Sequence, residues 1–168
     1  LNELDLNYDS CTIGDIGGDG PGYDNKGGCA ESIAGMKDYD IVVWFTGNDY
    51  GYPFPTLTST DQEELEKFLD DGGKLFITGQ DVGYDIGAAD FYRDYLHAYF
   101  CKNDADDYSL EGTSNEPIGD SLLINIDGGA GNQEYPSLIF YVKYLSPTNT
   151  FYPENNSFYY GLVVDNIY

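Results

Sequence analysis

The stretch Asp71–Asp85, DGGKLFITGQDVGYD, decides the fold, because it combines a buried strand with a sharp turn. The apolar run KLFITG follows a double glycine and leaves through a Gly-Gln-Asp corner. Many α/β hydrolases and amidotransferases place a catalytic nucleophile at such a corner. Here the corner holds neither Ser nor Cys, so either another group performs the chemistry or the chain keeps the fold without a catalytic function.

The residues before this stretch predict a second strand and a connecting helix. Tyr39–Gly47, YDIVVWFTG, is an uninterrupted run of β-branched and aromatic residues, typical of a strand covered on both faces in the middle of a sheet. The segment TLTSTDQEELEKFLDDGG predicts a helix that is capped by Ser59 or Thr60 and ends at Gly72–Gly73. Its apolar stripe comprises Leu65, Phe68 and Leu69. Strand, helix and strand at this spacing predict a parallel crossover.

The rest of the chain predicts smaller elements around this unit. We expect a short strand at Tyr8–Ile13, a Gly/Asp-rich loop, a helix at Ala89–Cys101 and short strands from Asp106 onward. We expect residues 1–168 to form a single α/β domain. Both ends look cut, which indicates a piece of a larger polypeptide.

Composition limits the partners. The chain has 168 residues, 41% of them hydrophobic, and a net charge of -23 from 30 acidic and 7 basic side chains. Such a charge repels nucleic acid and anionic membrane surfaces. It suits cations or cationic peptides as partners, or simply a solvated acidic surface in a salty or extracellular medium. The sequence contains no apolar run long enough for a bilayer and no signal sequence at its start, so we expect no membrane insertion. The wealth of Tyr, Gly and Asn favours a secreted or cell-surface protein.

Several segments of the sequence resemble an accessory domain of large secreted peptidases. These segments are YDIVVWFTGNDYG, TLTSTDQEELEKFLDDGGKLFITGQDVGYDIG, FYRDYLHAYF and GNQEYPS, and together they cover most of Asp38–Ser137. The peptidases are of the subtilisin-like and immune-inhibitor-A types. The resemblance implies the class I glutamine amidotransferase-like fold, a flavodoxin-like three-layer sandwich with a mostly parallel sheet, to which this chain adds short strands in its C-terminal part. In that fold the first strand would precede Leu1.

The resemblance also implies a function. In active amidotransferase-like enzymes the strand equivalent to KLFITG ends in a nucleophilic Cys, whereas this chain has Gly79, Gln80 and Asp81 there. We therefore expect a non-catalytic accessory domain that serves folding, spacing or contact with substrate or partner. Its partner would be the catalytic domain of the same polypeptide. The crevice at the carboxyl ends of the strands would be lined by Asn48, Asp49, Gly79, Gln80, Asp81 and Asp85.

Two chemical resources keep a hydrolase or amidotransferase-like enzyme open as the alternative. Asp49, Asp81 and Asp85 follow predicted strands, and two such acids could act as acid and base. The alternative, which we favour, is that Asp81 and Asp85 bind backbone N–H groups of the turn and the following segment. His97 and Cys101 could share a face of the predicted helix as a reactive pair or could simply pack there.

Two further sites follow from side-chain chemistry. Asp15, Asp19 and Asp24 in the Gly-rich loop carry oxygen ligands that suit calcium, and Asn103, Asp104, Asp106 and Asp107 form a second cluster of the same kind. We expect either no cofactor or calcium. Among the three cysteines, a Cys11–Cys29 disulfide would tie down a loop with little apolar surface and requires an oxidising compartment, whereas three reduced cysteines remain the alternative.

Overall fold

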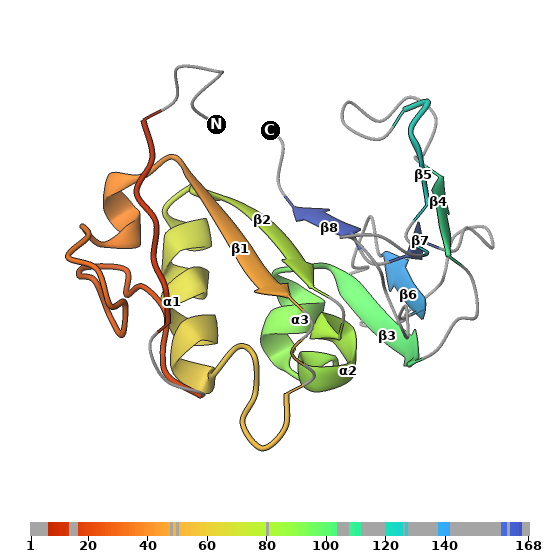
Figure 1. The fold of residues 1–168 in the computed structure, drawn as a ribbon, viewed down its shortest axis with the longest axis horizontal. Coiled ribbons are helices and arrows are strands. Elements are labelled where there is room, and N and C mark those ends of the chain that lie inside the picture. Colours follow the sequence, from red (N-terminus) through yellow and green to blue (C-terminus); the bar gives the residue numbers. More distant parts are fainter. Residues whose placement is uncertain are drawn as a thin grey trace.

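A parallel pair of strands packed on a helix forms the centre of the fold (Figure 1). In this computed structural model, β1 (Ile41–Gly47) and β2 (Lys74–Gly79) pair in parallel and are connected by α1 (Ser59–Asp70). On the other side of β2, β8 (Leu162–Asp165) pairs antiparallel. The structure describes residues 7–13, 17–47, 49, 51–79, 81–103, 108–111, 120–125, 127, 138–141, 159–160 and 162–165.

Most of the other elements follow β2 in the chain. After the Gly79 corner come two short helices, α2 (Val82–Ile86) and α3 (Asp90–Asp94). An antiparallel sheet follows in the order β3-β6-β7, with β3 at Ala98–Lys102, β6 at Leu138–Tyr141 and β7 at Tyr159–Tyr160. β4 (Ser109–Glu111) and β5 (Leu123–Asn125) pair separately, and a 3₁₀ turn, η2 (Met36–Asp38), precedes β1. The α/β class is confirmed, and short strands follow Asp106, as expected.

Helix α1 starts at a capping box. The Thr58 hydroxyl accepts a hydrogen bond from the Asp61 N–H at 3.1 Å, and the Asp61 carboxylate accepts one from the Thr58 N–H at 2.9 Å. The predicted caps, Ser59 and Thr60, are therefore wrong by one and two residues: the reciprocal pairing requires a residue three positions before the acid. The helix ends as predicted, since Gly72 has a φ of +90°, which L-residues rarely adopt.

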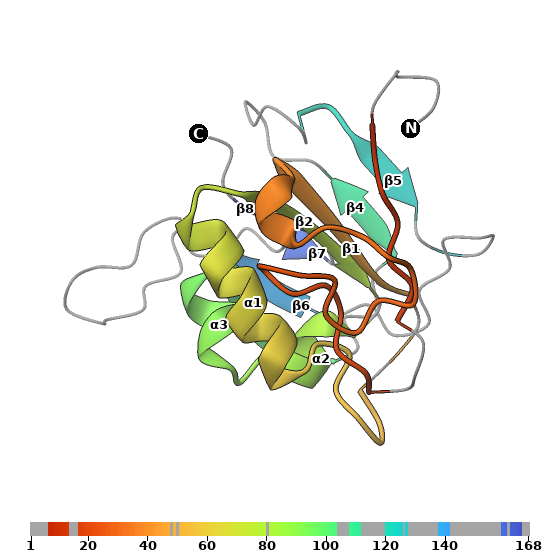
Figure 2. The same cartoon turned by 90° about the vertical axis from the view of Figure 1, so that its left-hand side faces the viewer.

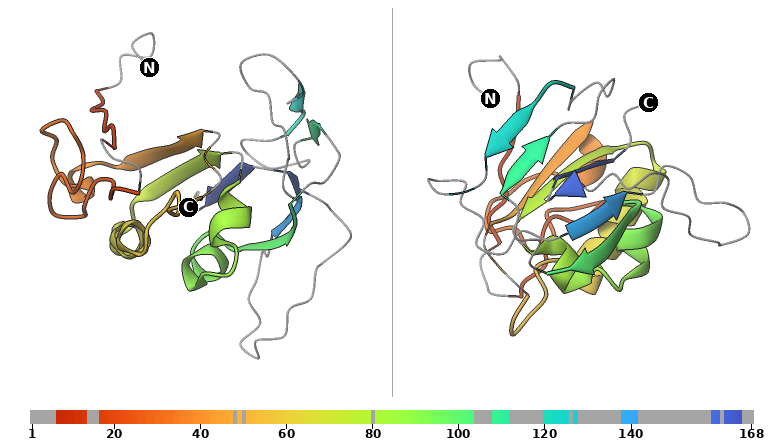
Figure 3. Two further views of the ribbon diagram at one scale, coloured as in Figure 1. Left: turned by 60° about the horizontal axis from the view of Figure 1, so that its bottom comes forward. Right: turned by 90° about the vertical axis from the view of Figure 1, so that its right-hand side faces the viewer.

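The core lies between the sheet and the helices. Figure 2 and the left view of Figure 3 show α1, α2 and α3 on the same side of β1 and β2. All three predicted stripe residues of α1 are buried there. The buried apolar side chains of this layer include Trp44, Leu57, Leu65, Phe68, Leu69, Leu75, Ile77, Val82, Ile86, Phe91, Tyr92 and Leu96.

Strand β1 is correctly predicted, but its place in the sheet is not. In the described sheet, β1 has one neighbour, β2, and stands at the edge of the order β1-β2-β8. Trp44 is buried, whereas Ile41, Val43 and Phe45 are 57%, 47% and 70% exposed on the opposite face. Among the described residues, the prediction of a strand covered on both faces in the middle of the sheet is therefore wrong. A continuous apolar run does not distinguish a face that the chain covers from one that it leaves open.

Two predicted elements have a different structure. Residues 7–12 form no strand, and Ile13 makes only an isolated bridge to Cys29. The predicted helix Ala89–Cys101 ends at Asp94, and β3 begins at Ala98, because pairing with β6 overrides the helical spacing of the aromatic residues.

The sheet is also less parallel than predicted. Among the described strands only β1 and β2 pair in parallel, and β8 joins them antiparallel. No described helix is both long and apolar enough to cross a membrane.

Candidate functional site

Three of the predicted crevice residues lie at the carboxyl ends of β1 and β2: Asp49, Gly79 and Asp81. Asp49 lies just beyond Gly47 of β1, and Asp81 follows the Gly79 corner of β2. Asn48 and Gln80 lie outside the described residues. Asp81 is buried at the N-cap position of α2, although its carboxylate accepts no capping hydrogen bond. The expected position at the strand ends is thus observed for Asp49, Gly79 and Asp81.

The Asp85 carboxylate fastens a loop at this edge. It accepts hydrogen bonds from the Thr56 N–H at 2.6 Å and the Thr56 hydroxyl at 2.7 Å, which joins α2 to the segment that leads into α1. The segment passes so close that a Cβ on Gly51 would lie 2.2 Å from Asp85 Oδ1. Asp49 in turn accepts from the Gly51 N–H at 3.2 Å. Both carboxylates therefore bind backbone N–H groups, and for Asp85 this is the structural role that the sequence had suggested.

The glycine at the corner has a packing role. A Cβ on Gly79 would lie 1.6 Å from the Thr46 hydroxyl of the neighbouring strand, so only glycine fits this position. The close contact between the two strand ends leaves the corner without room for a side chain at Gly79.

His97 and Cys101 do not share a helix. His97 lies in the connection between α3 and β3 with a φ of +48°, and Cys101 belongs to β3. The Cys101 thiol donates to the Tyr99 carbonyl at 3.7 Å, and its side chain is half-buried rather than packed into a helix. The helical Cys–His pair is therefore wrong, because its i,i+4 spacing existed only in the predicted helix.

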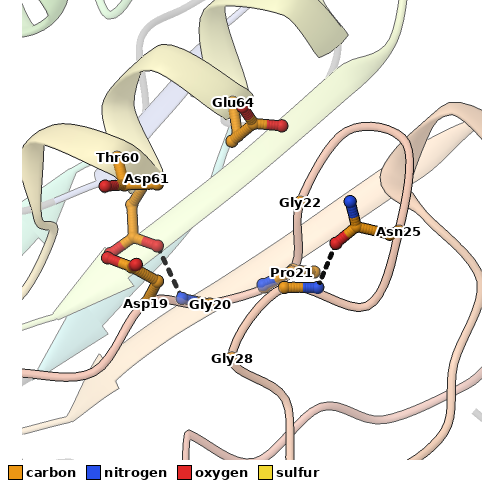
Figure 4. A pocket seen from close by; sticks show the side chains of 10 residues that line it. Asp19, Gly20, Pro21, Gly22, Asn25, Gly28, Thr60, Asp61 and Glu64 are labelled. Atoms are coloured by element: carbon orange, nitrogen blue, oxygen red, sulfur yellow. Dashed lines mark hydrogen bonds between the residues drawn. The ribbon is translucent and has the colours of Figure 1, made fainter.

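The Gly-rich loop forms a second site against α1 (Figure 4). Cys11 and Cys29 form a disulfide, which confirms the predicted pairing and is consistent with a secreted protein. The loop and the start of α1 line a pocket of about 200 Å³ that is open to solvent. Its lining consists of Asp19, Gly20, Pro21, Gly22, Asn25, Gly27, Gly28, Thr60, Asp61 and Glu64.

Three carboxylates hold this loop to α1. Asp61 accepts from the Gly20 N–H at 2.6 Å, and Glu64 accepts from the Tyr23 N–H at 2.6 Å. In the third bond the donor is on the helix side: the Thr58 hydroxyl at the start of α1 donates to the Asp19 carboxylate of the loop at 2.7 Å. These bonds place Gly20 on the ring of Trp44, where a Cβ would lie 2.3 Å from Trp44 Cη2. The loop therefore closes one side of the core.

The two helix carboxylates have opposite electrostatic environments. Burial raises the pKa of Asp61 above its usual range, against the hydrogen bonds from Gly20 and Thr58, and the charge of Asp19 raises it further. The hydrogen bond from Lys67 lowers the pKa of Glu64, and the Tyr23 N–H lowers it further. Of these two carboxylates, the fold therefore disfavours the ionised form of Asp61 and favours that of Glu64.

The predicted calcium ligands do not converge among the described residues. Asp19 binds Thr58, whereas Asp24 makes an ion pair with Lys37 at 2.9 Å. Asp15, Asp104, Asp106 and Asp107 lie outside the described residues. Within the described ranges, no three His, Cys, Asp or Glu side chains gather in a way that could hold a metal ion.

Sequence reasoning missed the residues that fasten both loops. Thr58 and Asp61 had a local signal, the three-residue spacing of a capping box. The Thr56–Asp85 bond and the contact between Gly20 and Trp44 join residues 29 and 24 positions apart and leave no such signal. Comparison with protein-family models, curated proteins and solved structures found no match to this chain.

Proposed function

We propose that this chain is a non-catalytic accessory domain of a large secreted peptidase, serving folding, spacing or contact with substrate or partner. The observation that supports this best is the use of the carboxylates. Asp85 and Asp49 bind the segment before α1, and Asp61 and Glu64 bind the Gly-rich loop. A general acid or base must reach a substrate proton, whereas these oxygens accept hydrogen bonds from the protein backbone.

The proposal extends to the fold and the location. The Cys11–Cys29 disulfide supports a secreted or cell-surface protein. The parallel β1–β2 pair, with helices on one side, supports a flavodoxin-like three-layer sandwich whose further layer covers the open face of β1. In this proposal the partner is the catalytic domain of the same polypeptide.

Substitution within the complete parent protein tests the accessory role. Asp49→Asn, Asp81→Asn and Cys101→Ser should leave peptidase turnover within about twofold, and the wild-type chain on its own should not hydrolyse amide or ester substrates. A loss of about 10²-fold or more in a folded variant would assign a transition-state role to that side chain and favour the hydrolase alternative. Asp85→Ala serves as the matched comparison, since it should lower stability without such a loss.

For cofactors the proposal is either none or calcium, which the Gly-rich loop would bind through Asp15, Asp19 and Asp24. Calcium that binds the folded state raises the melting temperature by mass action, whereas added salt raises it by screening repulsion between the acidic groups. Titration with calcium chloride at constant ionic strength separates these effects. An unchanged melting temperature would remove calcium from the proposal, and Asp19→Asn should abolish any shift that occurs.

A further inference from the structure

Strand β3 contains a bulge at Cys101. In its pairing with β6, Phe100 and Lys102 face consecutive residues, so Cys101 is the extra residue between them. Regular alternation would place Cys101 on the same face as Tyr99, which is 51% exposed, yet Cys101 is half-buried. Bulges redirect side chains in this way and occur often beside functional sites. The bulge therefore holds the Cys101 thiol partly covered but within reach of a small reagent.

Helix α3 places the Tyr92 hydroxyl next to this strand without a hydrogen-bond partner. Tyr92 is 0% exposed, and its Oη forms no hydrogen bond with the described part of the chain. A Cβ on Gly83 would lie 2.7 Å from Tyr92 Oη and 2.9 Å from Phe100 Cδ2. The hydroxyl thus lies between α2 and the residue that precedes Cys101, where both short helices meet β3 (Figure 1). Buried polar groups in proteins are almost always hydrogen-bonded, so an acceptor for this hydroxyl is expected.

Electrostatics connect the hydroxyl with Cys101. Burial raises the pKa of Tyr92 above its usual range, and the charge of Cys101 raises it further. The phenol therefore stays protonated at neutral pH and can donate a hydrogen bond. The two side chains are near enough for their charges to interact, but no hydrogen bond joins them. A thiol is a weak acceptor, whereas an oxygen atom on the sulfur would be a strong one and would extend beyond it.

We propose that Cys101 is a site of reversible oxidation by hydroperoxides, at which Tyr92 donates a hydrogen bond to the oxygen added to the sulfur. The Cys101 thiolate attacks the terminal oxygen of a hydroperoxide, ROOH. The O–O bond breaks as the S–O bond forms, the sulfur is oxidised to a sulfenic acid, S–OH, and the hydroperoxide is reduced to RO⁻. RO⁻ takes up the proton that the thiol had lost and leaves as ROH.

The oxidation is reversed by a small thiol. The first thiol molecule attacks the sulfenic sulfur and displaces water, which leaves a mixed disulfide on Cys101. A second attacks the outer sulfur of this disulfide and releases the Cys101 thiol. The inference goes beyond the accessory role and does not depend on it. It also differs from the hydrolase alternative, in which Cys101 would attack an acyl carbon.

Trapping of the sulfenic acid in the native chain tests the proposal. The chain is treated with hydrogen peroxide in the presence of dimedone, which labels sulfenic acids, and peptide mapping locates the adduct. The adduct should form on Cys101 about tenfold faster than on N-acetylcysteine at the same pH, and excess small thiol added before dimedone should restore the Cys101 thiol. A rate at or below that of the model thiol, or oxidation that the small thiol does not reverse, would overturn the proposal.

The variant Tyr92→Phe tests the hydrogen bond. It removes only a hydroxyl that has no partner to lose, so the melting temperature should not fall. Formation of the adduct should slow about tenfold, because the oxygen loses its charge-assisted hydrogen bond. Tyr84→Phe is the matched control: its ring packs edge-on against Phe100 at 6.3 Å, but the side chain is 54% exposed, and its loss of a hydroxyl should leave the rate unchanged. Equal rates in Tyr92→Phe and the wild-type chain would refute the role of Tyr92.

Alkylation by iodoacetamide separates an effect on the oxygen from an effect on the thiol. This reagent adds no oxygen to the sulfur, so Tyr92→Phe should change the rate of Cys101 alkylation by less than about twofold while it slows the reaction with peroxide. An equal slowing of both reactions would mean that Tyr92 controls access to the thiol, and would overturn the hydrogen bond to the added oxygen.

Discussion

The two faces of β1 differ strongly in how far they are exposed. On one face Trp44 is 6% exposed, covered by α1 and by Gly20 of the disulfide-bonded loop. On the other face Phe45, the next residue, is 70% exposed. Both residues are large and aromatic and belong to one strand. The comparison shows that residue type sets how much apolar surface is available, whereas the surrounding elements decide which side becomes core.

Replacement of each aromatic residue by alanine is the strongest test of this comparison. Trp44→Ala should lower the free energy of unfolding by about 3–5 kcal/mol, because it leaves a cavity beneath the Gly-rich loop. Phe45→Ala should change it by less than about 0.5 kcal/mol, because an exposed side chain loses little buried surface. Urea denaturation of both variants measures the difference. Equal losses would mean that the outer face is covered in solution.

Removal of the disulfide should weaken the covered face alone. Cys11 and Cys29 are 18 residues apart, and closing a loop of this size stabilises by about 3 kcal/mol in the chain-entropy model. The double change Cys11→Ser and Cys29→Ser should lower stability by about that amount and shift the emission of Trp44, the single tryptophan, towards that of exposed indole. Cys101→Ser is the matched control and should do neither. Three alkylatable thiols in the unreduced protein would contradict the disulfide.

Gly20→Ala tests the contact between the loop and the core. The added methyl group would meet Trp44 Cη2 at 2.3 Å, so the loop or the indole must move, at a cost of about 1–3 kcal/mol. In a Trp44→Leu background, where the ring is absent, the same change should cost less, and thermal unfolding of the four proteins gives the coupling. Additive effects would show that the loop does not rest on Trp44.

The smallest expected effect is a pH dependence at the same boundary. The pKa of Asp61 is raised by burial, so its stabilising contribution is complete below the unfolded value of about 3.9 and is lost as pH rises through the folded value. Asp61→Asn should remove this loss from urea titrations across the acidic range. Glu64, whose pKa is lowered chiefly by Lys67, should show the opposite trend, with stability lost as pH falls, and Glu64→Gln should abolish that loss. Parallel pH profiles for the two variants would contradict these environments.

Local pattern determined the elements at the centre of the fold. The apolar runs of β1 and β2, the stripe Leu65–Leu69 and the stop at Gly72 were each readable from neighbouring residues. The Cys11–Cys29 pairing was predicted as well, since a loop poor in apolar side chains gains most from a covalent link. For the site, the sequence located Asp49, Gly79 and Asp81 at the strand ends, because the carboxyl ends of parallel strands share one edge.

Tertiary structure alone decided the roles of these residues. Pairing with β6 made a strand of Ala98–Lys102, which the spacing of its aromatic residues had predicted as helix. Asp85 and Asp61 accept long-range hydrogen bonds from the backbone of distant loops, at Thr56 and Gly20. The open face of β1 was equally hidden from the sequence. Periodicity reports contacts within one element, whereas burial and hydrogen bonding depend on elements that meet only after the chain has folded.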